Sequence, residues 1–124
     1  SNVGGDSGGS YGGKGGESGN GLTNAIFGDY QQPIDFGMGG SSNSGSPYRT
    51  RGGGAIKIIA NTFTLDGLIS VNGGSPTASV AGGGGSGGSV WLDVGTLLGA
   101  GSISANGGDK GVNGGGGGGN GGGR

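Results

Sequence analysis

Apolar residues occur at alternate positions in two stretches of the chain, residues 55–74 and 89–108. Successive side chains of a β-strand point to opposite faces, so Ile56 and Ile58 are expected to share an inner face and Lys57 an outer face. The first stretch predicts three short strands separated by turns, at residues 55–60, 63–65 and 69–71.

The second stretch is a copy of the first, displaced by 34 positions. Seven pairs of residues are identical: Thr62/Thr96, Gly67/Gly101, Ile69/Ile103, Ser70/Ser104, Asn72/Asn106, Gly73/Gly107 and Gly74/Gly108. Where an apolar residue is replaced, an apolar residue mostly takes its place, as in Ile56/Val90, Ile58/Leu92, Ala60/Val94, Phe63/Leu97 and Val71/Ala105. A repeat of fixed period is typical of solenoids, in which each unit stacks on the next.

The pattern therefore predicts an all-β fold, a parallel β-solenoid whose coils are joined by glycine-rich segments. Residues 75–88 and 109–123 are expected to return the chain to the start of the next coil. An antiparallel β-sandwich is the alternative, but it gives no reason for the copies to match position by position. The predicted core and assembly residues are Ile56, Ile58, Phe63, Leu65, Ile69, Val71, Val90, Leu92, Val94, Leu97 and Ile103.

We expect one domain over residues 1–124, in which repeat 1 covers residues 55–88 and repeat 2 covers residues 89–124. Residues 1–54 are a Gly/Ser-rich segment. Residues 1–21 are predicted to be either a flexible linker or extended glycine strands packed closely on their neighbours. Residues 22–36 form a separate apolar block. Pro33 excludes a helix through this block, which is expected to pack locally on the repeats.

Glycine supplies 42 of the 124 residues, yet the chain has only 3 prolines and no glycine triplet frame. Collagen is thereby excluded. The formal net charge of −1 and the scattered cationic residues argue against nucleic acid as a partner. No apolar run approaches the length of a membrane-spanning helix, so membrane insertion is not expected.

The chain has no histidine and no cysteine, which excludes histidine acid–base chemistry and the usual zinc sites. Its seven acidic residues show no paired spacing. The segment 84–92 fits the frame of a calcium-binding β-roll, but Ser89 stands where that motif has aspartate. We therefore predict no catalytic, cofactor or metal residues and no enzymatic activity.

A contact surface is predicted at two places. Lys57 and Trp91 occupy equivalent outer positions of the two copies, where a cation–π contact fits. In the apolar block the candidates are Phe27, Tyr30 and Phe36. We favour contacts between protein chains here, with a carbohydrate as the alternative partner.

The repeats GGGAIKIIANTFTLDGLISVNGG and GGSGGSVWLDVGTLLGAGSISANGG resemble the glycine-rich repeats of very large secreted and cell-surface proteins. Their style is similar to that of filamentous-haemagglutinin-type adhesins, which are parallel β-helices. This resemblance implies an extracellular, non-enzymatic, structural or adhesive role. The long glycine runs depart from ordinary adhesin coils.

A solenoid usually needs about three repeats for stability, and this chain has two. We therefore expect it either to belong to a longer repeat protein or to stack on other copies of itself. The predicted function is a structural subunit or segment of an extracellular β-rich filament or surface stalk that assembles through open β-edges and coil stacking. An adhesive module for carbohydrate or ice is the alternative.

Overall fold

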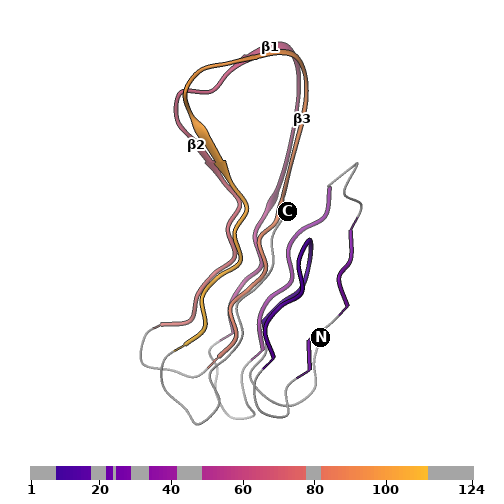
Figure 1. The fold of residues 1–124 in the computed structure, drawn as a ribbon, viewed down its shortest axis with the longest axis vertical. Coiled ribbons are helices and arrows are strands. Elements are labelled where there is room, and N and C mark those ends of the chain that lie inside the picture. Colours follow the sequence, from indigo (N-terminus) through magenta and orange to yellow (C-terminus); the bar gives the residue numbers. More distant parts are fainter. Residues whose placement is uncertain are drawn as a thin grey trace.

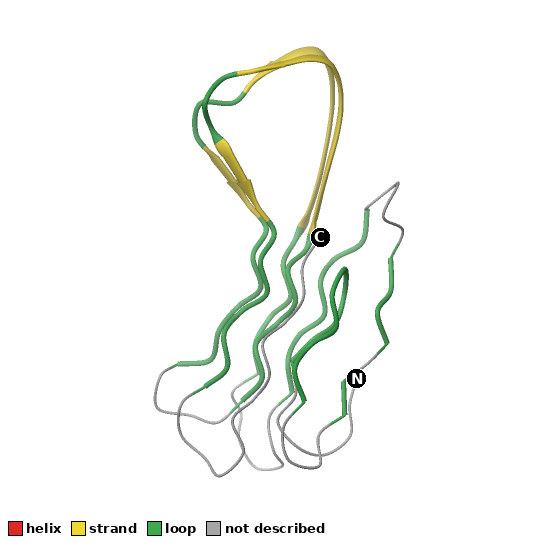
Figure 2. Cartoon of the chain, in the orientation of Figure 1, coloured by secondary structure: helices red, strands yellow, loops and turns green. Residues whose placement is uncertain are grey.

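The computed structural model describes residues 8–17, 22–23, 25–28, 34–41, 49–77 and 82–111. These residues form four strands and no helix (Figures 1 and 2). The strands are β1 (Ala55–Thr64), β2 (Leu68–Ser70), β3 (Ser89–Leu98) and β4 (Ser102–Ser104). The described chain is therefore β-rich, as predicted.

The two copies of the repeat lie on one another in register. β1 pairs with β3 in parallel, from Ala55 opposite Ser89 to Thr64 opposite Leu98. β2 pairs with β4 in the same way, with Ile69 opposite Ile103. Figure 1 shows both copies following one outline, with β1 and β3 along one side and over the top and β2 and β4 along the other. The 34-residue offset predicted from the repeat is confirmed, and the pairing is parallel rather than antiparallel.

The division into strands differs from the prediction at residues 55–65. The two short strands expected there are one continuous strand of ten residues, β1. The alternation of faces changes phase within it, because Asn61 and Thr62 are both exposed. Opposite this point Gly95 has no side chain, and a Cβ there would lie 2.8 Å from the Asn61 carbonyl oxygen. Because Gly95 has no Cβ, the two copies remain in close contact where both strands bend near Asn61.

The glycine-rich segments form a second structure below the strands. In Figure 1 they run side by side as extended, gently wavy traces, and Figure 2 marks them as loop. Residues 82–89 lie at their centre, and all eight are buried. Residues 75–88 were predicted to return the chain to the start of the next coil. The part at residues 82–88 forms, together with Ser89, the most continuously buried stretch of the described chain.

Hydrogen bonds between these segments recur every third residue. The carbonyls of Gly82 and Gly85 accept from the N–H groups of Gly111 and Gly108 at 3.0 and 2.7 Å. On other sides of residues 82–89 the same spacing recurs in the pairs Gly83–Ser41 and Ser86–Met38, and in the pairs Gly85–Gly74 and Gly88–Val71. A β-strand would repeat every second residue, whereas a polyproline II helix has three residues per turn. The spacing therefore indicates a bundle of such extended helices, which satisfy one another's backbone groups.

Hydroxyl side chains complete this network. The Thr50 hydroxyl accepts from Gly40 N–H at 3.0 Å and donates to the Gly83 carbonyl at 2.7 Å. The Ser86 hydroxyl accepts from Met38 N–H at 2.6 Å. A buried backbone group without a partner is costly, so these side chains stabilise the packing by pairing with backbone groups of the segments.

The same close packing extends to residues 8–17. Gly8 N–H donates to the Gly16 carbonyl, and Gly9 N–H donates to the Gly84 carbonyl. A Cβ on Gly15 would collide with the backbone of Gly8. Of the two alternatives for the N-terminal segment, packed extended glycine segments describe residues 8–17.

Candidate functional site

Within the described residues, each strand is paired along one edge only. The sheets of the described residues have two strands each, β1 with β3 and β2 with β4. We call the free side of β1 and β2 the first-copy edge, and the free side of β3 and β4 the second-copy edge. Both edges present backbone N–H and C=O groups that a further strand can bind. These two edges are the candidate functional site.

The predicted core residues line the inside of the stacked outline, but most are only half-buried. Val71, at 4 % exposure, is the one predicted core residue in the buried class. At the second-copy edge Leu97 and Ile103 remain 53 % and 45 % exposed. The half-buried members are Ile56, Ile58, Phe63, Leu65, Ile69, Val90, Leu92 and Val94. Two layers leave the interior open at both ends, so each apolar side chain has a neighbour on one side only.

The predicted contact between Lys57 and Trp91 is present. The two residues are partners in the β1–β3 register, and the Lys57 Nζ lies 4.2 Å from the centroid of the Trp91 ring. An ammonium group over an indole face is attracted by the negative face of the ring. Asp93 is exposed two positions further along the same outer face of β3.

The aromatic candidates of the apolar block are not brought together. Phe27 packs on the fully buried Tyr11, with ring centroids 4.9 Å apart at an angle of 55°. Gly28 adopts a φ of 89° beside the Tyr11 ring, where a side chain would collide. Phe36 is 71 % exposed. Tyr30 lies outside the described residues. Phe27 therefore has a local packing role, and of the two described candidates Phe36 is the one with an exposed aromatic surface.

A set of polar side chains also links the two copies, and the sequence reasoning missed it. Three first-copy side chains accept the backbone N–H of the residue 34 positions later: Asp66 from Ala100 at 3.4 Å, Asn72 from Asn106 at 2.8 Å, and Ser75 from Asp109 at 2.9 Å. All three residues lie outside the strands, where these side chains continue the links between the two copies. Asn72 and Asn106 are identical in the two copies, and this identity is the signal from which the link could have been inferred.

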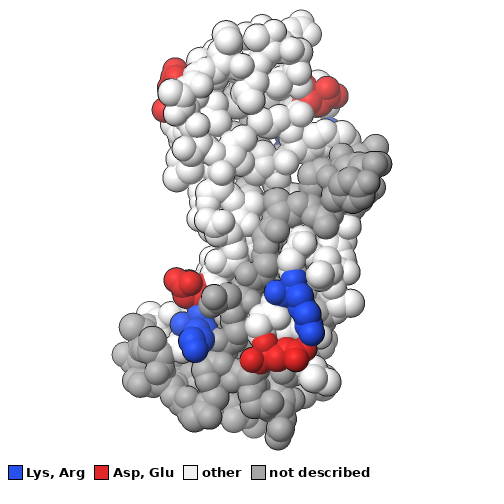
Figure 3. Space-filling view, in the orientation of Figure 1, with Lys and Arg blue, Asp and Glu red and all other residues white. Residues whose placement is uncertain are grey.

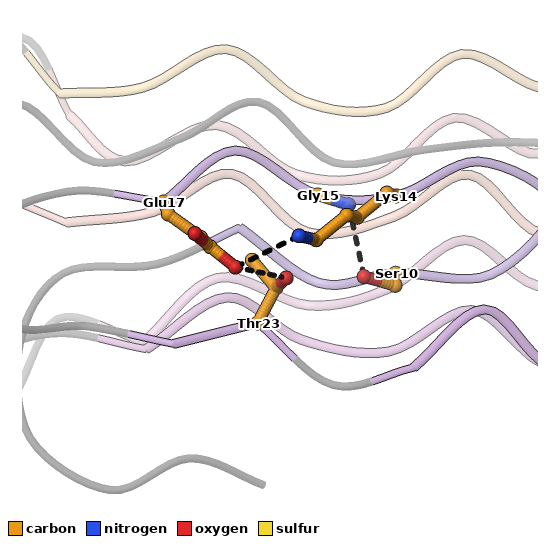
Figure 4. A network of polar contacts seen from close by, with 5 residues as sticks. All are labelled: Ser10, Lys14, Gly15, Glu17 and Thr23. Carbon is orange, nitrogen blue, oxygen red and sulfur yellow. Dashed lines mark hydrogen bonds and ion pairs between the residues drawn. The ribbon is translucent and has the colours of Figure 1, made fainter.

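A separate polar network ties the N-terminal segment together (Figure 4). Lys14 Nζ lies 3.0 Å from Glu17 Oε1, and the Thr23 hydroxyl donates to the same carboxylate at 3.3 Å. The hydrogen bond and charge of Lys14 lower the pKa of Glu17 below its ordinary value of 4.5. Nearby, Gly15 N–H donates to the Ser10 hydroxyl at 2.9 Å. This network holds residues 8–17 in shape and is distant in sequence from the strand edges.

Charged side chains are sparse on the face shown in Figure 3, where most of the described surface is white. Among the described residues there is no group of three or more His, Cys, Asp or Glu side chains placed to hold a metal ion. The described part of the chain also contains no helix that could cross a membrane. Backbone edges and apolar rows are the features of the described strands that an interaction can use.

Comparison with known proteins identifies no relative of the chain. No protein-family model, no curated protein and no solved structure matches the chain.

Proposed function

We propose that this chain is a structural subunit or segment of an extracellular β-rich filament or surface stalk, assembled by stacking of β-solenoid coils. One observation carries the proposal. Two related copies of the repeat stack in register, and among the described residues no strand pairs with the outer edge of any of the four strands.

An edge of this kind favours addition of more chain. Both edges present the same outline with the same strand direction. The contacts that join the second layer to the first can therefore also join a third layer to the second. A joint between two different surfaces of the same subunit does not close on itself when the step is a simple translation, and it then generates an open filament.

Stacking would also bury the apolar rows that two layers leave open. Full burial of a Leu or Ile side chain stabilises by roughly 1.5–3 kcal/mol relative to its exposed state. Leu97 and Ile103, both about half exposed, would gain part of this when covered by another layer. The added backbone hydrogen bonds act in the same direction.

The extracellular location rests on the resemblance of the repeats to those of large secreted and cell-surface proteins. Attachment of an epitope tag, followed by fractionation of the source cells and surface labelling, would test it. Recovery of the tagged chain only from the interior of the cells would contradict this part of the proposal.

Electron microscopy of the purified chain, with helical reconstruction, tests the assembly. Each chain contributes two layers spaced by about 4.8 Å, so we expect filaments with an axial step of roughly 10 Å per chain. Discrete particles of one chain at all concentrations, with no fibrous material, would contradict the proposal.

A binding module for carbohydrate or ice is the second candidate. It is favoured by the exposed apolar side chains of the block at residues 22–36, among which Phe36 is the most exposed. A glycan array and an ice-affinity assay of the unassembled chain separate the two candidates. Binding that is lost in Phe36→Ala but kept in Leu22→Ala would favour the module.

A further inference from the structure

One face of the half-buried Trp91 ring is covered by the Lys57 side chain. The Lys57 ammonium lies on the side of β1, 4.2 Å from the ring centroid. The opposite face of the ring is turned away from Lys57, towards the side of β3 on which the described residues form no further strand. Within one chain, the first copy has lysine at this position and the second copy has tryptophan. The residue that covers the second face of the Trp91 ring therefore depends on which layer is added next to β3.

We propose that chains join head to tail in the same 34-residue register, so that the second-copy edge of one chain binds the first-copy edge of the next and Trp91 lies between two lysines. The first lysine is Lys57 of its own chain, and the second is Lys57 of the neighbouring copy. This inference rests on the proposed assembly and specifies its polarity and register.

Shape favours this direction of joining. The outline has unequal sides, with the ten-residue strand β1 on one and the three-residue strand β2 on the other. A copy turned over would run its outline in the opposite sense, so its long and short strands would not both meet their counterparts. A copy that is only translated matches both strands and the apolar rows together.

Charge favours it as well. With a translated copy, Lys57 of the neighbour would lie opposite Trp91 and diagonal to Asp93, within the range at which opposite charges on one sheet face attract. Joining two first-copy edges would instead bring the Lys57 side chains of both chains to one interface, with no carboxylate of β1 to balance them. The column of alternating lysine and tryptophan keeps like charges two layers apart, roughly 10 Å.

The polar side chains that link the two copies fit the same joint. Asn106 and Asp109 stand at the second-copy edge where Asn72 and Ser75 stand in the first copy. Their oxygen atoms are therefore placed to accept the backbone N–H groups of Asn72 and Ser75 of the next chain. Ala100 replaces Asp66, so two of the three links can be repeated across the joint.

Ile59→Pro tests the polarity. Gly54 accepts from Ser89 N–H at 3.0 Å, and bonding sides alternate along a strand, so the N–H of Ile59 faces away from β3. The side chain of Ile59 is 68 % exposed. Proline is tolerated on a free strand edge and blocks addition there, so this variant loses the first-copy edge and keeps the fold. Ile59→Val, which retains the N–H, is the matched control.

Analytical ultracentrifugation of the two variants distinguishes the joints. Head-to-tail joining needs one edge of each kind, so we expect Ile59→Pro to remain monomeric while Ile59→Val assembles like the wild type. If each edge instead bound its own kind, Ile59→Pro would form dimers through its second-copy edges, and this result would overturn the inference while leaving the proposed filament intact. A wild-type chain that never assembles would overturn both.

A second pair of variants keeps the test decisive if circular dichroism shows that Ile59→Pro is unfolded. Lys57→Met removes the cation on both sides of Trp91, and Arg49→Met removes an exposed cation elsewhere. We expect the critical concentration for assembly to rise roughly threefold to tenfold for Lys57→Met and to stay unchanged for Arg49→Met. The emission of Trp91, the chain's single tryptophan, should become less accessible to acrylamide on wild-type assembly. Equal critical concentrations for the two variants would overturn the inference.

Discussion

Glycine is important in this protein mainly because it has no side chain. In the bundle below the strands, backbone atoms of one segment occupy the space that a side chain on its neighbour would fill. A Cβ on Gly85 would lie against the Arg51 carbonyl, and one on Gly84 against the Gly108 carbonyl. Gly54 and Gly67 have no atom within 4 Å of the equivalent point. The same residue type is therefore required at some positions and interchangeable at others.

This difference gives a matched pair of substitutions. We expect Gly85→Ala to lower the free energy of unfolding by about 2 kcal/mol or more, because the added methyl group overpacks rigid backbone. Gly54→Ala should change it by no more than about 1 kcal/mol, and in the stabilising direction, because it restricts the unfolded chain. Urea unfolding below the assembly concentration measures both. Equal effects would contradict the close packing at residues 82–89.

The ion pair of Lys14 and Glu17 predicts a pH dependence. The pKa of Glu17 is lowered in the folded chain, chiefly by its hydrogen bond with Lys14. A lowered carboxyl pKa stabilises the fold above the unfolded value of about 4.5, and this contribution is lost as the pH falls through the folded pKa. The pair is exposed to solvent, so the effect on stability is small.

Lys14→Met tests this assignment directly. We expect the pKa of Glu17 to rise towards its ordinary value in the variant, as followed by the carboxyl chemical shift in an NMR titration. Lys110→Met serves as a control for removal of one positive charge at a distant site in the sequence. A Glu17 pKa that rose equally in both variants would mean that general charge, rather than the hydrogen bond of Lys14, lowers it.

At the scale of elements, β1 and β3 show how one strand serves two surfaces. Ile58 points into the stacked outline and pairs with Leu92, whereas the adjacent Ile59 points outward. The inner row supplies apolar contact from layer to layer, and the outer row carries the Lys57–Trp91 contact. Adjacent residues of one strand therefore affect different parts of the assembly.

Two aspartate substitutions separate these roles. Ile58→Asp places a charge in the apolar row, where it has no partner, and we expect it to abolish assembly and to destabilise the monomer by several kcal/mol. Ile59→Asp places the same charge in solvent and should leave the fold of the monomer unchanged. Electron microscopy and chemical unfolding measure the two effects. Filaments that persist in Ile58→Asp would contradict the proposed core.

At the scale of the whole molecule, a stack of β-layers continues into a bundle of glycine-rich segments. Figure 1 shows that the same chain segments run through both parts, so layers that stack in one part also lie side by side in the other. The upper end of the stacked outline stands clear of the N-terminal segments in this view. Stability is expected to come from backbone hydrogen bonds more than from a large apolar core, since the buried apolar side chains of the described residues are Tyr11 and Val71.

Such a molecule should become more stable as it assembles. Association that occurs only in the folded state stabilises that state by mass action, so the melting temperature depends on protein concentration. We expect the wild-type melting temperature to rise with each tenfold increase in concentration, and that of Ile58→Asp to stay constant. Differential scanning calorimetry over a hundredfold concentration range measures this. A constant wild-type value would contradict assembly of the folded chain.

The sequence by itself determined the repeat, its 34-residue period, the parallel register of the two copies and the partnership of Lys57 with Trp91. These follow from the alternation of apolar and polar residues and from the matching positions of the two copies. Both can be read directly from the linear sequence. The division into strands was less accurate, because the corner at Asn61 depends on the close approach of Gly95 in the other copy.

The tertiary structure alone decided the role of the glycine-rich segments and the exposure of the apolar rows. Residues 82–89 carry no side-chain pattern that marks them as buried, because their packing is made by backbone atoms of segments distant in sequence. The exposure of the inner apolar side chains likewise cannot be read from the repeat sequence. It depends on how many layers are stacked, and two layers leave each inner side chain with a neighbour on one side only.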